Sequence, residues 1–262
     1  MEKNMDFPRE ELLEKYIRIY EQWVAPYTPD FEVADGTTRY IRFNDAWQGM
    51  DPFAKFLISR LTNRKNTFPK TPSAKIAKNA NPANYITLRY DSEGRLKMAR
   101  LGETGVDALV FVYVSEQLTI CYCLHSIPGV GVKHSLYNFV WYEYDDAGRL
   151  ISAEEFRGSG IPTDDVTINS EYYEYEGDVL SHAWYFREFQ KYPIEMSMEL
   201  VRRMMPDRIF NPDQFEYSFQ RVADGLDYSC NHYFRKSQTL TDNGHVSEET
   251  LSHLAQNGIC LV

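Results

Sequence analysis

Long apolar runs, short catalytic motifs and metal-ligand spacings are all missing from this sequence. No stretch approaches the length of a membrane-spanning helix. No glycine-rich loop carries the lysine and hydroxyl residue of a phosphate-binding loop, and no serine lies in a strand-to-helix nucleophile elbow. These absences argue against the common nucleotide-binding and hydrolase classes. We therefore expect no catalytic residue of a recognisable type and no cofactor.

Cysteine is scarce, and its spacing carries no metal signal. The four cysteines form no CxxC pair and no zinc-ligand pattern, so we expect reduced thiols and no metal site: Cys121, Cys123, Cys230 and Cys260. The first residues, MEKNMDFPREELLEKY, are charged and lack the apolar segment of a secretory signal. Both features predict a cytoplasmic protein that does not enter a membrane.

Acidic residues are absent from one long segment of an otherwise acidic chain. The net charge is −10, which disfavours nucleic acid and anionic lipid as partners. Residues 52–90 nevertheless contain no Asp or Glu and carry eight basic residues: Lys55, Arg60, Arg64, Lys65, Lys70, Lys75, Lys78 and Arg89. Two interpretations remain open. The segment lies on an acidic sheet of the same molecule, or it forms a face for an anionic partner.

Helical periodicity is confined to a few short segments. Asp6 is placed to cap a helix that starts near Pro8. The apolar stripe expected for this helix consists of Leu12, Leu13, Tyr16, Tyr20, Trp23 and Val24. Further helices are expected over 51–65, near 193–205 and near 247–257.

Between residues 85 and 192, most of the chain shows the two-residue alternation of side chains that is typical of β-strands. Aromatic residues make up 15% of the sequence and 19 of them are Tyr, a good strand former with a polar tip. The residues Val140, Tyr142 and Tyr144 alternate with Phe139, Trp141 and Glu143, which predicts one drier and one wetter face. Shorter hairpins are expected in 31–43, 108–124 and 215–234.

The turns between these strands repeat one pattern. In YDSEGRL and YDDAGRL an aspartate opens a type I turn, and a glycine three residues later accepts a left-handed conformation. Such a turn closes a hairpin with a β-bulge. Gly94 and Gly148 hold that position, and Gly177 and Gly225 are expected in tighter versions of the same corner.

The repeated corner resembles the YD repeats of Rhs-type and wall-associated bacterial proteins. The resemblance rests on Tyr90-Asp91-x-x-Gly94-Arg95-Leu96 and Tyr144-Asp145-x-x-Gly148-Arg149-Leu150, and it covers roughly 85–186. It implies a meander in which each hairpin packs on the next. It does not imply toxin encapsulation, because the long arrays of that family contain many more copies.

The expected fold class is α+β. A twisted antiparallel β-sheet built of successive hairpins carries the N-terminal helices and the short helices on one face or at one end. We predict two regions. Residues 1–84 form a helical N-terminal region with a small hairpin and the basic linker, and residues 85–262 form the hairpin domain.

Carboxylates and aromatic rings gather in the hairpin from Phe139 to Phe156. Paired carboxylates are typical of glycoside hydrolases, but they also serve as the solvated face of a sheet that avoids edge aggregation. Aromatic anchors flanked by acids are typical of a protein-binding surface. The predicted partner-binding residues are Trp141, Tyr142, Glu143, Asp145, Asp146, Glu154 and Glu155.

Three functional hypotheses follow from the residues and the resemblance. The leading one is a cytosolic protein-binding module, an immunity-type inhibitor that neutralises a bacterial toxin, whose partner is a cognate basic toxin. The second is an enzyme that acts on carbohydrate or nucleic acid with acidic residues of the sheet. The third is a structural scaffold with no ligand. The sequence does not fix the oligomeric state.

Overall fold

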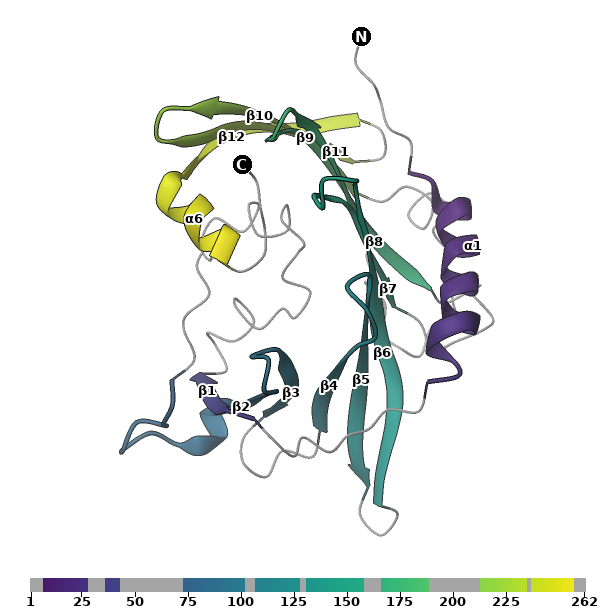
Figure 1. The fold of residues 1–262 in the computed structure, drawn as a ribbon, viewed down its shortest axis with the longest axis vertical. Coiled ribbons are helices and arrows are strands. Elements are labelled where there is room, and N and C mark those ends of the chain that lie inside the picture. The colour runs from purple at the N-terminus through teal and green to yellow at the C-terminus, as the bar shows by residue number, and fades with distance from the viewer. Residues whose placement is uncertain are drawn as a thin grey trace.

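The protein folds around a single antiparallel β-sheet (Figure 1). The computed structural model describes residues 7–27, 36–42, 73–101, 107–127, 131–157, 166–188, 213–234 and 237–256. The twelve strands lie in the order of the chain, β1 to β12, and each one runs antiparallel to its neighbours. The α+β class and the hairpin meander predicted from the sequence are confirmed.

The strands are β1 Thr38–Arg42, β2 Tyr85–Tyr90, β3 Leu96–Leu101, β4 Asp107–Tyr113, β5 Leu118–Ile127, β6 Gly131–Tyr144, β7 Leu150–Arg157, β8 Thr167–Glu176, β9 Val179–Arg187, β10 Asp213–Val222, β11 Gly225–Phe234 and β12 Ser237–Ser247. The helices are α1 Arg9–Ile19, continued by a π-helix Tyr20–Val24, a 3-10 turn Pro82–Asn84, and α6 Glu248–Gln256.

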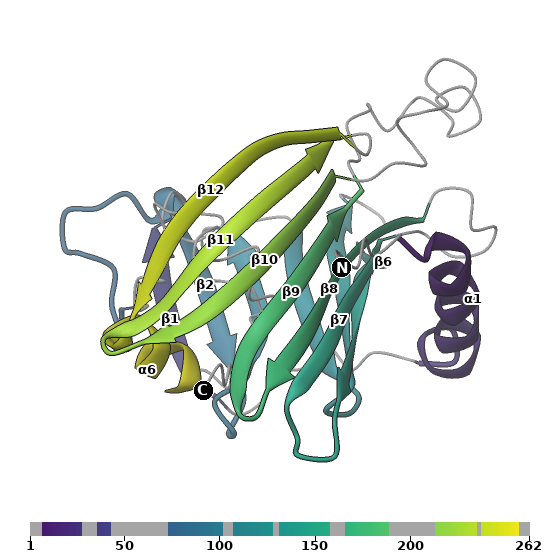
Figure 2. The same ribbon diagram turned by 90° about the horizontal axis from the view of Figure 1, so that it is seen from above.

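The sheet curls into a C whose two ends are β1 and β12 (Figures 1 and 2). Helix α1 lies against the outside of the C, and α6 lies on its inside next to β12. We call these sides the outer and the inner face. Leu251 of α6 joins an inner-face cluster that contains Tyr217 and Leu226.

The repeated corners have the predicted geometry. Gly94 and Gly148 are left-handed, with φ of 79° and 77°, and the ladder shifts register beside both turns, as a bulge requires. In the second copy Asp145 Oδ1 accepts hydrogen bonds from the backbone N–H groups of Ala147, at 3.0 Å, and Arg149, at 2.9 Å. The same aspartate accepts a hydrogen bond at 2.7 Å from Arg149 Nε through its other oxygen.

The arginine of each corner also contacts the next hairpin. Arg149 lies over the ring of Tyr175 on β8, and the Tyr175 hydroxyl donates a 3.0 Å hydrogen bond to the carbonyl of Leu150. In the first copy Arg95 lies over the ring of Tyr113, whose hydroxyl donates to the carbonyl of Leu96. The Asp-x-x-Gly-Arg-Leu pattern therefore repeats because each copy closes one hairpin and holds the following one.

A valine at position 148 should damage this corner. The strain comes from the backbone alone, because a Cβ on Gly148 would meet no atom within 4 Å. A β-branched residue resists a φ of 77°, so we expect Gly148→Val to lower the free energy of unfolding by about 1–3 kcal/mol in urea denaturation. An unchanged midpoint would contradict the left-handed corner. Ala147→Val, at an exposed neighbouring position, is the matched control.

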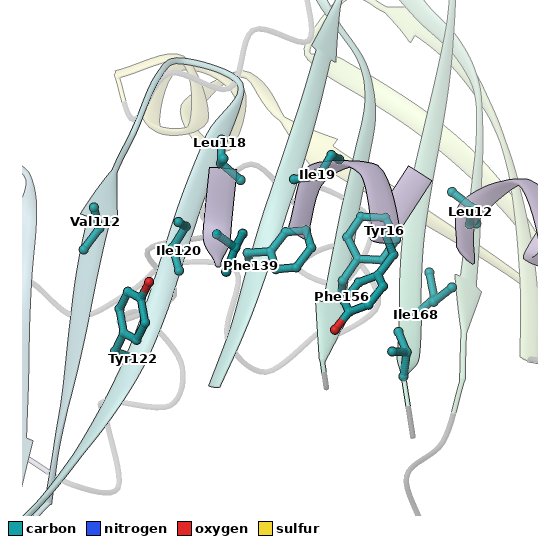
Figure 3. Packing of buried hydrophobic residues seen from close by; sticks show 12 residues of the cluster. Leu12, Tyr16, Ile19, Val112, Leu118, Ile120, Tyr122, Phe139, Phe156 and Ile168 are labelled. Carbon is teal, nitrogen blue, oxygen red and sulfur yellow. The ribbon is translucent and has the colours of Figure 1, made fainter. Parts of the chain in front are cut away.

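Helix α1 packs on the outer face through aromatic and aliphatic side chains (Figure 3). Tyr16 is fully buried, and its ring stacks on Phe139 of β6 at 5.5 Å and contacts Phe156 of β7 at 5.8 Å. Leu12 and Ile19 are buried one turn on either side of it. The helix thus crosses several strands and holds them together.

One member of the predicted helical stripe is misplaced. Trp23 is 43% exposed, whereas Val24 is buried. The cause is the π-helical turn, in which Ala25 N–H donates to Tyr20 O, five residues back. The wider turn rotates the last residues relative to α-helical spacing, so Val24 rather than Trp23 follows Ile19 into the core. The helix begins after Pro8 without a side-chain cap, and Asp6 lies outside the described residues.

The remaining predicted elements are described only in part. The helix near 247–257 is confirmed as α6, and Thr250 N–H donates to Ser247 Oγ at its start. The helices expected over 51–65 and near 193–205 lie outside the described residues. Within the part that is described, none of the helices has the length and apolarity needed to cross a membrane.

The first strand links the two regions predicted from the sequence. Of the hairpin expected over 31–43, only its second half falls within the described residues, as β1, and residues 31–35 lie outside them. The described partner of β1 is β2, with Thr38 opposite Arg89. The other edge of β1 is met at one point, where Tyr40 and Ser73 exchange two backbone hydrogen bonds of 2.8 Å. The N-terminal region therefore contributes one strand to the sheet of the hairpin region.

Candidate functional site

The predicted partner-binding residues lie on three different surfaces of the β6–β7 hairpin. Cross-strand pairing places Trp141 opposite Glu154 on the outer face, beneath α1. Tyr142 pairs with Ala153, and both are buried in an inner-face cluster. The corner holds Asp145 and Asp146. The hairpin does not present one continuous surface because neighbouring residues of a strand point to opposite faces.

Three of the seven predicted partner-binding residues are buried, which corrects their assignment to an accessible surface. Tyr142 is 2% exposed, Glu154 3% and Glu155 6%, so none of these side chains is open to a partner. The sequence places both glutamates on the wet face of a sheet. In the structure Glu154 is covered and paired with Lys15, and Glu155 is covered and hydrogen-bonded by two asparagine amides and Arg157. Trp141 is half-buried against the cluster beneath α1, and Glu143 is partly exposed.

Lys15 of α1 joins the two outer-face carboxylates. Its ammonium group lies 2.8 Å from Glu143 Oε1 and also contacts Glu154 Oε2. Burial is the largest single effect at Glu143 and disfavours its charged form, but the hydrogen bond and positive charge of Lys15, together with the hydrogen bond from Ser152, outweigh burial and lower the pKa of this carboxyl. At Glu154 burial dominates over Lys15, and it raises the pKa. One lysine therefore holds two carboxylates whose pKa values move in opposite directions.

Two carboxylates with separated pKa values are a feature of acid–base catalysis, but here they also lock the helix to the sheet. A second ion pair does the same at the start of α1, where Arg9 Nε lies 2.6 Å from Glu188 Oε1. Burial raises the pKa of Glu188, and its second oxygen accepts from the backbone N–H of Ile168 at 2.8 Å.

Glu155 faces inward and is bound by three donors. Asn138 Nδ2 lies 2.5 Å from its Oε1, Asn169 Nδ2 lies 2.8 Å from its Oε2, and Arg157 Nε lies 2.8 Å from Oε1. These contacts satisfy a nearly buried carboxylate without a metal ion. Among the described residues no group of His, Cys, Asp and Glu side chains has the arrangement of a metal site.

Of the two carboxylates at the corner, Asp145 stabilises the turn and Asp146 is exposed. The hydrogen bond from the Arg149 side chain, with those from the backbone, lowers the pKa of Asp145, which is committed to the turn. Asp146 is exposed beside it. Of the carboxylates predicted for this hairpin, Asp146 is therefore the one that a partner can reach without breaking an internal contact.

Sequence reasoning missed Lys15, Asn138 and Asn169, which decide where the glutamates go. Lys15 had a local signal, since it lies between Leu12 and Tyr16 on the buried side of an amphipathic helix. The two asparagines had no such signal, because other polar residues lie in the same strands.

The topology gathers corners that are far apart in the sequence. In a meander every second turn lies at the same end of the strands, so β2–β3, β4–β5, β6–β7, β8–β9 and β10–β11 all turn at one rim (Figure 2). Each of these corners carries at least one carboxylate. We define the acidic rim by Asp91, Glu93, Glu116, Asp145, Asp146, Glu176, Asp178 and Asp224.

No family model matches the chain, and a search of the curated proteins finds no match.

Proposed function

We propose that this chain is a cytoplasmic protein-binding module of the immunity type, which neutralises a bacterial toxin by binding it directly. The observation that carries the proposal is the acidic rim. Carboxylates on the five corners at this end of the strands form one extended edge that suits a partner with a basic surface. A toxin that acts on nucleic acid has such a surface, because it must bind phosphates.

The internal contacts of the β6–β7 hairpin favour binding over catalysis. Glu143 and Glu154 are paired with Lys15, Glu155 with Arg157, and Asp145 with Arg149. Carboxylates in such pairs are held in one position by the fold itself. Asp146 is exposed, and the Asp178 side chain is 96% exposed although it lies 3.8 Å from Arg149 Nη1, so both remain accessible to a partner. The likeness of the corners to YD repeats adds a toxin-related context.

Charge reversal on the rim tests this function. We expect Asp146→Lys combined with Asp178→Lys to slow association with the toxin at least about tenfold, because steering by the rim is lost. Wild-type association should itself slow as salt is raised. Asp145 is left unchanged, since its reversal would break the turn rather than only the surface.

The assay uses the product of the gene beside the one that encodes this chain. Growth rescue is scored on co-expression, and the association rate is measured with both purified proteins. Glu14→Lys combined with Glu21→Lys, an equal charge change at exposed positions of the N-terminal helix, is the control and should rescue like the wild type. Full rescue by the rim variant, with an unchanged association rate, would refute the rim as the binding surface. A neighbouring product that is not toxic would refute the immunity role.

A further inference from the structure

A shallow hollow lies on the outer face of the last three strands, away from α1. It has a volume of about 700 Å³. The residues around it come from β10, β11 and β12. Phe219, Tyr228 and Gly244 are among them, and the side chains that strand alternation places on the outer face are polar: Ser218, Gln220, Asp227, Ser229, Asn243 and His245. None of the hypotheses drawn from the sequence uses these residues.

Strand register explains why the surface is hollow here. Ser218 lies directly opposite Ser229, and Ser229 lies opposite Asn243, so small side chains meet at the centre. The larger neighbours Phe219 and Tyr228 belong to the other face, where they pack against the inner-face cluster. The floor of the hollow is therefore backbone, and its wall is made of short hydrogen-bonding groups.

A fixed ion pair forms one side of the hollow. His245 Nδ1 lies 2.7 Å from Asp227 Oδ1, directly across the β11–β12 ladder. The hydrogen bond that the imidazole donates to Asp227 raises the pKa of His245, and Asp224 at the adjacent corner adds to the effect. Asp227 contributes a negative charge, and no lysine or arginine lines the hollow. A phosphate or another strong anion therefore has no counter-charge here.

Three polar side chains of the hollow are open, unlike those of the next row. The side chains of Ser218, Gln220 and Ser229 have no hydrogen-bond partner among the described residues. One row further along the same face, Thr241 Oγ1 lies 3.1 Å from Asn231 Oδ1 and the Tyr233 hydroxyl donates to Glu216 at 3.1 Å. The side chains of that row hydrogen-bond to one another, whereas the side chains of Ser218, Gln220 and Ser229 are open to a ligand.

We propose that this hollow binds a neutral, hydroxyl-rich ligand of the saccharide class. A sugar hydroxyl both donates and accepts, and the serine hydroxyls and the Gln220 amide do the same. The second oxygen of Asp227 accepts from a hydroxyl while His245 keeps the carboxylate oriented. The site lies on the outer face rather than on the acidic rim, so it does not depend on the proposed toxin-binding role.

The test is an NMR titration of the full chain, with the His245 imidazole signals and the backbone amides of 218 and 229 as reporters. The probes are glucose, N-acetylglucosamine, maltose and cellobiose. For a small open site we expect saturable shifts from at least one of them, with a dissociation constant on the order of 1 mM. Ser229→Val fills the floor and removes a hydroxyl, and we expect it to abolish the shifts. Thr241→Val, in the neighbouring row, should leave them unchanged.

Glycerol and inorganic phosphate are the discriminating controls. Shifts that do not saturate, or that glycerol reproduces at equal concentration, would overturn the proposal, since they report solvent rather than a site. Saturation with phosphate and not with any sugar would also overturn it, because the hollow would then be an anion site. Retention of sugar binding by a folded Ser229→Val variant would place the ligand elsewhere and reject this hollow.

Discussion

Phe139→Ala should be the most damaging single substitution in the described core. Phe139 is fully buried on β6, and its ring lies 5.2 Å from Phe156 and 5.5 Å from Tyr16 of α1. Its removal leaves a cavity between the helix and two strands, for which we expect a loss of about 3–5 kcal/mol in the free energy of unfolding. Urea denaturation measures this loss. Hydrogen exchange should show α1 amides losing protection first, because the helix depends on this contact.

The matched control lies two residues away on the same strand. Tyr137 is 43% exposed, so we expect Tyr137→Ala to cost less than about 1 kcal/mol. Equal losses for the two variants would mean that α1 does not pack on Phe139. If Phe139→Ala fails to fold, Phe139→Leu keeps most of the volume, and it should still destabilise more than Tyr137→Ala.

Lys15→Met should destabilise the protein strongly near neutral pH. The substitution keeps the length of the side chain but leaves the buried carboxylate of Glu154 without its cation. Removing one partner of a buried pair costs about 3–5 kcal/mol, and we expect the lower end because Glu143 is partly exposed. Lys133→Met, at an exposed position, should change stability by less than about 0.5 kcal/mol.

The loss should depend on pH with a definite sign. Burial already raises the pKa of Glu154 above its usual 4.5, and without Lys15 this pKa rises further. A carboxyl with a raised pKa in the folded state contributes stability that is complete below pH 4.5 and disappears as pH rises through the folded pKa. Lys15→Met should therefore be mild near pH 4.5 and severe at pH 8. Adding Glu154→Gln to Lys15→Met should restore stability at pH 8. If it does not, the ion pair between Lys15 and Glu154 is not what the first substitution disrupts.

The hairpin corners were predictable because their determinants are local. Asp145, Gly148 and Arg149 lie within five residues, and the turn they make needs no partner from elsewhere. The contact of Arg149 with Tyr175 was not predictable in the same way, since it joins successive hairpins. Turn chemistry predicts each corner, and the stacking of one corner on the next follows only from the assembled sheet.

Two failures of the sequence reasoning have separate physical causes. Trp23 was assigned to the core because α-helical spacing was assumed, and a single π-turn changes that spacing. Glu154 and Glu155 were assigned to solvent because a carboxylate is rarely buried alone. Their partners lie far along the chain, Lys15 in α1 for one and Asn169 in β8 for the other. No local pattern contains that information.

The serial order of the strands has a consequence for synthesis on the ribosome. Each of the hairpins from β2 onward closes between segments that emerge soon after one another, so the sheet grows as the chain is made. Helix α1 emerges first, yet its anchors Phe156 and Glu188 are made long after it. At 5–20 residues per second, α1 waits roughly ten to thirty seconds for Glu188. During that interval the nascent chain exposes an apolar helical stripe that a chaperone can bind, and docking of the first helix is among the last steps of folding.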